Sequence, residues 1–361
     1  MLTGFLFFVG SYAQEKGAGQ VKTADPQYVL QIKKARAAIL DSMSRHHIPG
    51  AAIAVSVNDT VVWSEGFGYA DLEQRVPATP STKFRIGSIS KSLTAAAVAQ
   101  LVENGKLDLD APIQKYVPSF PSKKWIITPR QLAGHLAGIR HYRGEEFLLQ
   151  RRFATVTDGL SIFANDTLLF EPGTNYAYTS YGWNLLSAAV EGASRENFLV
   201  YMNKHVFQPL GMRNTIADHG DSIIAYRTRF YTLDSLDVII NASYVDNSYK
   251  WAGGGFLSTP EDLVTYAQMW LNPGFLKPET KTLFTTSQRT TTGKVTKYGM
   301  GWFIDVDKMN RPTIAHGGGS AGGTSLLILY PDQRFVVALM CNSDERFVNT
   351  AATMVDIFLT R

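Results

Sequence analysis

Apolar and polar residues follow strand-like and helix-like spacings in different parts of the chain. Two runs rich in β-branched and small apolar residues, 51–57 and 61–67, flank a short polar turn and predict a β-hairpin. A helical spacing over residues 26–46 precedes this hairpin. Strand-like runs return near the end of the chain, ahead of a final helix predicted over about 345–359. These later runs lie at residues 300–306, 313–315, 324–329 and 335–340.

The middle of the chain, residues 106–250, has mainly helical and loop patterns. Its clearest helical pieces are 185–191 and 198–207. We therefore predict an α+β (mixed α/β) fold, in which one antiparallel sheet is built from both ends of the chain and flanked by helices, with a mostly helical subdomain inserted. A cleft between the two parts is the expected place for a site. The expected single domain is 26–361, with a sheet part at about 26–87 and 251–361 and a helical part at about 88–250.

Composition excludes several classes of protein. The formal net charge is +4 and the basic residues are scattered, so no nucleic-acid partner is expected. The single cysteine, Cys341, excludes an internal disulfide. The seven histidines show no metal-ligand spacing, so we predict neither a metal site nor a cofactor.

The first residues have an apolar composition of their own. Residues 1–13 are too short to span a bilayer, which takes about 20 apolar residues. Their length suits the hydrophobic region of a signal peptide, and Ser11-Tyr12-Ala13 fits a small-x-small cleavage site. The usual basic region is missing, so either the start is truncated or the segment is not a signal. We favour export, followed by a polar linker over residues 14–25.

Candidate chemistry centres on Ser88 and Lys91, which stand three residues apart at the start of a predicted helix. Side chains at i and i+3 share a helix face, so the hydroxyl and the amine can meet. A serine hydroxyl becomes a useful nucleophile when a neighbouring base takes its proton. The amine needs its pKa lowered from about 10.4 to about 7–8 to act as that base, and burial lowers it. A helix cap beside a solvated lysine is the alternative for this motif alone.

Two later stretches supply partners for this pair. Tyr178 and Ser180 stand two residues apart ahead of a helix and offer a phenol and a hydroxyl in one place. His316 begins the stretch His-Gly-Gly-Gly, which ends at Gly319 on a predicted strand. A hydrogen-bonding side chain followed by glycines, Gly318 among them, allows a substrate to lie along the backbone. The N–H groups of Gly319 and Ser88 are then candidates for an oxyanion hole.

The order Ser-x-x-Lys, Tyr-x-Ser and His-Gly-Gly, with about 90 and about 140 residues between them, resembles the penicillin-recognising serine enzymes. These comprise class C β-lactamases, D-Ala-D-Ala carboxypeptidases and related esterases, with a β-lactamase/transpeptidase-like fold. Residues 244–259 look closest to the mitochondrial serine β-lactamase-like branch of animals. That branch carries a long charged insertion that this chain lacks, so the export-like start favours a bacterial, periplasmic or secreted relative.

The resemblance implies a serine hydrolase in which Ser88 is acylated by an amide or ester and Lys91 and Tyr178 exchange protons with it. It implies substrate contacts for Ser180, His316, Gly318 and Gly319 in the cleft. Two positions depart from the most active β-lactamases, which carry asparagine in place of Ser180 and lysine in place of His316. We therefore expect poor hydrolysis of penicillins and a peptide or ester substrate. The alternative function is a self-assembling scaffold or binding protein, because the mitochondrial branch forms filaments; a homo-oligomer stays open.

Overall fold

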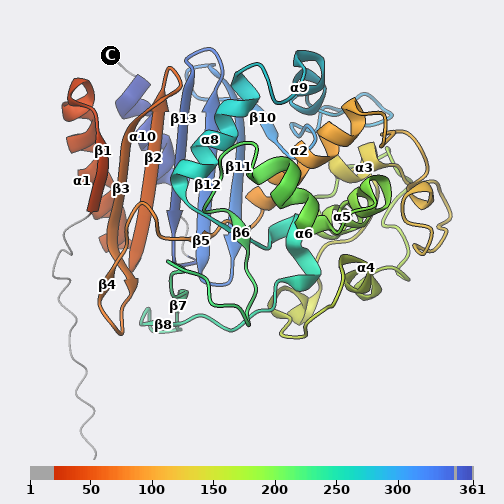
Figure 1. The fold of residues 1–361 in the computed structure, drawn as a ribbon, viewed down its shortest axis with the longest axis horizontal. Coiled ribbons are helices and arrows are strands. Elements are labelled where there is room, and N and C mark those ends of the chain that lie inside the picture. Colours follow the sequence, from red (N-terminus) through yellow and green to blue (C-terminus); the bar gives the residue numbers. More distant parts are fainter. Residues whose placement is uncertain (1–19, 345–347, 360–361) are drawn as a thin grey trace, which may run out of the picture.

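A large antiparallel sheet forms the frame of the molecule in the computed structural model, which describes residues 20–344 and 348–359 (Figure 1). Its strands follow the order β1-β3-β2-β13-β12-β11-β10, and β4 pairs with β3. All the pairings are antiparallel, and the sheet combines both ends of the chain. The strands are β1 (Gln20–Ala24), β2 (Gly50–Val57), β3 (Thr60–Asp71), β4 (Val76–Pro77), β10 (Phe303–Val306), β11 (Pro312–Ser320), β12 (Gly323–Tyr330) and β13 (Phe335–Cys341).

The central strands of the sheet are apolar on both faces, and helices cover each of these faces. In β13, Val336 and Ala338 belong to one core cluster, whereas Val337 and Leu339 belong to a second. Successive strand residues point to opposite faces, so a continuous apolar run marks a strand that is buried on both sides. Helices α1 (Val29–Arg45) and α10 (Val348–Leu359) contact each other at one face, and α8 (Pro260–Leu271) packs on the other.

The remaining helices gather beside the sheet and form the second part of the molecule, at the right of Figure 1. Helix α2 is buried along almost its whole length and packs against α5, α7 and β11. The final turn of α6 passes directly into a π-helix over Met202–Phe207. These helices are α2 (Ile89–Glu103), α3 (Pro129–Ala133), α4 (Val156–Gly159), α5 (Tyr181–Ser194), α6 (Phe198–Tyr201), α7 (Trp251–Gly254) and α9 (Pro278–Phe284).

Short strands link the two parts. Strands β5 (Phe84–Arg85), β9 (Phe256–Ser258) and β6 (Ile216–Ala217) form a small sheet in the order β5-β9-β6. Strands β7 (Tyr231–Leu233) and β8 (Ile239–Asn241) form a separate hairpin. Because β5 immediately precedes α2, and β9 leads from α7 to α8, this small sheet holds the start of α2 near the large sheet.

The predicted fold class is confirmed, with two local corrections. The linker expected over 14–25 is wrong for residues 20–24, which form β1 and pair with β3. Edge pairing satisfies backbone groups of this polar segment, so it needs little apolar character to form a strand. The strand expected over 300–306 covers only Phe303–Val306. The signal peptide expected over 1–13 lies outside the described residues, and the domain division remains a proposal.

Candidate active site

Ser88 lies at the start of α2, where the chain passes very close to strand β11. A Cβ added at Gly87, whose φ is +46°, would stand 2.5 Å from the carbonyl oxygen of Gly319. A Cβ at Gly318 would stand 1.9 Å from the carbonyl oxygen of Ile86. Only glycine permits two backbones to approach so closely. These glycines therefore fix Ser88 beside the exposed end of β11.

The side chains of Ser88 and Ser180 are both free of helix-capping hydrogen bonds. Ser88 is the N-cap of α2 and Ser180 is the N-cap of α5, and neither hydroxyl accepts from a backbone N–H of the helix it caps. Instead, Lys91 Nζ lies 2.9 Å from Ser88 Oγ and 2.9 Å from Ser180 Oγ. The amine also donates to the carbonyl oxygen of Gly253 in α7 at 2.6 Å. One buried amine thus joins three elements that are far apart in the sequence.

The environment of Lys91 favours its neutral form. Its side chain is fully buried, and no carboxylate of the described residues forms an ion pair with it. Burial lowers the pKa of Lys91 well below its usual value, and the nearby charge of Lys250 lowers it further. A neutral amine beside Ser88 is able to accept a proton.

Tyr178 stands in a cluster of aromatic rings next to Lys91. Lys91 Nζ lies 4.9 Å from the centre of its ring. The imidazole of His135 packs 4.3 Å from the Tyr178 ring, and Phe303 stacks on it at 6.2 Å. Burial raises the pKa of the Tyr178 phenol well above its usual value, while its hydrogen bond with Ser88 opposes that rise. Tyr178 therefore keeps its proton at neutral pH.

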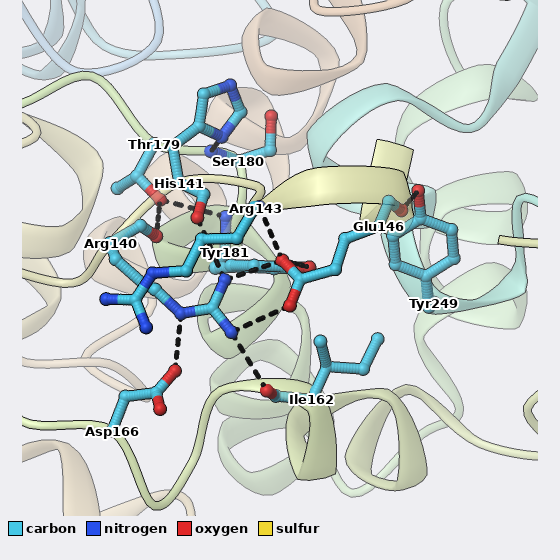
Figure 2. Close-up of polar contacts among 10 residues, drawn as sticks. All are labelled: Arg140, His141, Arg143, Glu146, Ile162, Asp166, Thr179, Ser180, Tyr181 and Tyr249. Atoms are coloured by element: carbon cyan, nitrogen blue, oxygen red, sulfur yellow. Dashed lines mark hydrogen bonds and ion pairs between the residues drawn. The ribbon is translucent and has the colours of Figure 1, made fainter. Parts of the chain in front are cut away.

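His141 supports Ser180 from the other side. The backbone N–H of Ser180 donates to His141 Nδ1 at 3.2 Å, which leaves the ring proton on Nε2 (Figure 2). Burial and the charge of Lys91 lower the pKa of His141 to about 4. At neutral pH its Nε2–H is consequently a hydrogen-bond donor and not a base.

A buried arginine holds the loop that carries His141. The guanidinium of Arg140 bonds Glu146 with both terminal nitrogens, at 2.6 and 2.9 Å, and forms an ion pair with Asp166 (Figure 2). Glu146 also accepts from the hydroxyl of Tyr181 at 2.8 Å. The carbonyl oxygen of Arg140 accepts from Thr179 Oγ1 at 2.6 Å. Two carboxylates balance the charge of this guanidinium, and together they fix the start of α5.

A cavity of about 130 Å³ opens onto Ser88. Ser180 and Gly319, both predicted as site residues, line it with Ser88. The rest of its wall is a mixture of aromatic, basic and glycine residues, namely His141, Tyr142, Phe147, Lys250, Gly253 and Gly254.

The structure places His316 and Gly318 away from this cavity. His316 is 1% exposed, and its Nδ1–H donates to the carbonyl oxygen of Gly317 at 2.6 Å. Its Nε2 accepts from the hydroxyl of Tyr298 at 3.0 Å, so both ring nitrogens are occupied. Burial and the charge of Lys91 lower the pKa of His316 to about 3. Gly318 is buried against Ile86.

The comparisons with known proteins agree with this geometry. The family model described as Beta-lactamase matches residues 35–358. The chain belongs to the beta-lactamase family. It is 33% identical over 414 residues to the human "Serine beta-lactamase-like protein LACTB, mitochondrial". The alignment covers 85% of this chain and 76% of that protein.

Solved structures of the beta-lactamase fold match most of the chain. The octameric penicillin-binding protein homologue from Pyrococcus abyssi is 26% identical, with a TM-score of 0.80 over 91% of this chain and 78% of the other. EstCE1, described as a hydrolase with promiscuous acyltransferase activity, is 22% identical, with a TM-score of 0.76 over 91% of this chain and 98% of the other. The second likeness shows the fold alone.

Sequence reasoning missed two parts of this beta-lactamase-family site. Lys250 lines the cavity but was not singled out, although a lysine between Tyr249 and Trp251, ahead of three glycines, is unusual for a solvated side chain. The Arg140–Glu146 network was also missed, because its partners become neighbours only in the fold. Within residues 20–344 and 348–359, no group of three metal-ligating side chains comes together. No helix of that part of the chain is long and apolar enough to cross a membrane.

Proposed function

We propose that this protein is a serine hydrolase that forms an acyl-enzyme on Ser88 and cleaves an amide or an ester. The observation that carries the proposal is the position of Lys91 Nζ, 2.9 Å from Ser88 Oγ, in a buried setting that favours the neutral amine. General-base catalysis needs a proton acceptor within hydrogen-bond reach of the nucleophile, with a pKa near the working pH. Lys91 meets the first condition by geometry and approaches the second through burial.

Acylation then proceeds in balanced steps. Ser88 Oγ attacks the substrate carbonyl carbon while Lys91 takes the hydroxyl proton, and the carbonyl oxygen becomes an oxyanion. The backbone N–H groups of Ser88 and Gly319, which both line the cavity, are the proposed oxyanion donors. Such donors typically contribute about 10²–10³ in rate.

Proton transfer to the leaving group is assigned to Tyr178. Its phenol is protonated at rest, and its ring lies beside Lys91 and close to Ser88. As the carbon–leaving-group bond breaks, Tyr178 donates its proton to the departing nitrogen or oxygen, and Lys91 returns a proton to the phenolate. Water releases the acyl group in the reverse sense, giving up a proton to Lys91 and regenerating the Ser88 hydroxyl.

Penicillins are proposed to be poor substrates, and peptides or esters better ones. In the β-lactamase pattern, the position of His316 holds a lysine that attracts the substrate carboxylate. Here a buried imidazole with a pKa of about 3 is neutral and occupied, so it offers no such charge. We assign His316 a positioning role behind Tyr298 and Tyr178. Gly318 is assigned the packing of β11 against the start of α2.

The test is the intact mass of the purified protein after exposure to a penicillin, an activated ester and a fluorophosphonate. The proposal expects an adduct on the wild type with the ester and the fluorophosphonate, and none on Ser88→Ala. Turnover should accompany the ester and be slow with penicillin. Absence of every adduct on folded protein would favour the scaffold reading instead, and nitrocefin turnover at class C rates would overturn the substrate assignment.

Assembly and location are further proposals. The octameric state of the Pyrococcus abyssi homologue supports a homo-oligomer, which light scattering at several protein concentrations tests. Export is proposed from residues 1–13, although the human relative is named as mitochondrial. Fractionation of cells producing the full chain, with N-terminal sequencing of the mature protein, distinguishes an exported product from a retained one.

A further inference from the structure

Lys250 is a buried lysine in the wall of the proposed active-site cavity. It precedes α7 and is only 2% exposed. Among the described residues, no carboxylate lies within ion-pair distance of it, and its Nζ donates to the carbonyl oxygen of Phe147 at 3.1 Å. An ammonium has three N–H donors. One backbone acceptor therefore leaves donors available to a bound group.

The surroundings of Lys250 stabilise a cation only in part. Its Nζ lies 4.5 Å from the centre of the Phe147 ring and 5.8 Å from that of Tyr142, both of which line the cavity. Such contacts contribute little next to the cost of burying a charge. A buried lysine without a counter-ion is expensive, and proteins usually keep such groups where a ligand supplies the missing charge.

The other charged groups nearby do not supply it. Arg85, on β5, is paired with Asp218 at 2.7 Å and lies 3.8 Å from the Phe230 ring centre. Asp218 also accepts from Asn247 at 2.9 Å, so its carboxylate is already engaged. Lys91, on α2, is also basic, and its pKa is lowered by burial and by Lys250, so it supplies no negative charge.

Lys250 is also the cavity side chain best suited to hold an anion. His141, the other basic residue in the wall, has a pKa of about 4 and is neutral. His316 is occupied and lies outside the cavity lining. Ser88, Ser180 and the three glycines of the wall carry no charge.

We propose that Lys250 binds a carboxylate of the substrate, so that this hydrolase prefers amides or esters that carry a carboxylate near the scissile carbonyl. The inference rests on the proposed function for its kinetic consequence. In this proposal the anion-binding side chain lies in the segment before α7, and not at His316 on β11.

The charge state of Lys250 fits reversible binding of an anion. Burial and the charge of Arg85 lower the pKa of Lys250 to about 7, and Asp218 opposes this shift. The ammonium is therefore partly populated at neutral pH, and a bound carboxylate raises its pKa. The neutral His141 lines the same cavity and Lys91 lies behind Ser88 and Ser180, so neither acts as a counter-ion for Lys250.

The kinetic test compares matched esters with wild type, Lys250→Met and Lys250→Arg. Mono-p-nitrophenyl glutarate is paired with p-nitrophenyl 5-methylhexanoate, which replaces the carboxylate by an isopropyl group of similar shape. A second pair places the carboxylate on the phenol leaving group. Lys83→Met is the matched control, because Lys83 is also buried and donates to one carbonyl, that of Ala225, outside the cavity.

We expect wild type to prefer the carboxylate member of at least one pair by about 10- to 100-fold in kcat/KM, the range for a hydrogen bond to a charged group. Lys250→Met should lose this preference, so that its kcat/KM falls at least about tenfold more for the carboxylate ester than for the matched neutral ester. Lys250→Arg should keep part of the preference, and Lys83→Met all of it. An equal loss on both esters in Lys250→Met, or a wild type without preference in either pair, overturns the inference.

A binding measurement separates this inference from the proposed catalysis. Calorimetry with glutarate monoanilide is carried out on Ser88→Ala and on Ser88→Ala combined with Lys250→Met. Binding that disappears only in the double variant supports the carboxylate site even if fluorophosphonate fails to label Ser88 in wild type. Equal binding by both variants refutes the site even if Ser88 is labelled.

Discussion

The buried position of Lys250 makes a quantitative prediction about stability. Replacing it with methionine removes the charge but keeps a flexible, unbranched apolar side chain of similar length. Its pKa falls from 10.5 in the unfolded chain to about 7 in the folded protein. Each unit of pKa shift corresponds to about 1.4 kcal/mol. Lys250 therefore lowers the free energy of unfolding by about 5 kcal/mol when it is protonated in both states, and by about 4 kcal/mol at pH 7.

The sign follows from proton binding. Between pH 7 and 10.5 the unfolded chain binds more protons at this lysine than the folded protein does, so the wild type gains stability as pH rises. Lys250→Met lacks this gain. The stability of the variant relative to wild type should therefore be highest near pH 6–7 and fall by about 3 kcal/mol by pH 9.5.

Equilibrium urea unfolding at pH 6.5, 7.5, 8.5 and 9.5 measures this difference, with Lys34→Met on the exposed face of α1 as the control. Transitions followed by tryptophan fluorescence and by circular dichroism must coincide for the free energies to be comparable. Curves for Lys250→Met and wild type that run parallel over this range would refute the reasoning, because Lys250 would then titrate alike in the folded and unfolded states.

Three further predictions concern the walls of the site. Gly318→Ala should destabilise the protein by about 3 kcal/mol, because its Cβ would meet a backbone oxygen at 1.9 Å, whereas Gly319→Ala has no atom within 4 Å and should leave the melting temperature unchanged in thermal unfolding. Between pH 6.5 and pH 4, wild type should lose about 3 kcal/mol more stability than His316→Gln, as measured by urea unfolding. The reason is that the imidazole of the unfolded chain gains a proton in this range, whereas the folded one, with a pKa of about 3, does not. Equal losses would contradict this. Arg140→Gln should lower the free energy of unfolding by about 2–4 kcal/mol, measured by the same method, and Arg130→Gln by less than about 1 kcal/mol. Arg140 is 6% exposed and lies between two carboxylates, whereas Arg130 is far more exposed. Similar losses would show that burial does not decide the effect.

Local spacing was sufficient to predict the start of α2. The Ser88–Lys91 pair depends only on the i, i+3 geometry of a helix, and the apolar residues that follow it recur at helical spacing. Tyr178 and Ser180 were predicted from their place ahead of a helix. The structure brings these four side chains together, and Ser180, the N-cap of α5, accepts a hydrogen bond from the Lys91 amine.

The glycine strand shows where such reasoning stops. Side chains alternate between the two faces of a strand, so His316 and Gly318 share one face of β11 while Gly319 points to the other. The sequence does not tell which face meets the cavity, since a shift of one residue exchanges them. The paired strand β12 and the backbone at Ile86 decide it, and they bury His316 and leave Gly319 open. Pairing between distant segments is the information that the motif lacked.

The electrostatics of the cavity follow from the same burial. Burial favours the neutral form at Lys91, His141 and His316 and keeps Tyr178 protonated. Lys250, with a pKa of about 7, is then the cavity group whose charge changes across the neutral range. Acylation needs a neutral Lys91, which higher pH favours, whereas carboxylate binding needs a charged Lys250, which lower pH favours. A neutral ester should therefore show a rate that rises and levels off with pH, and a carboxylate ester should show a maximum, because the two buried lysines impose opposite requirements.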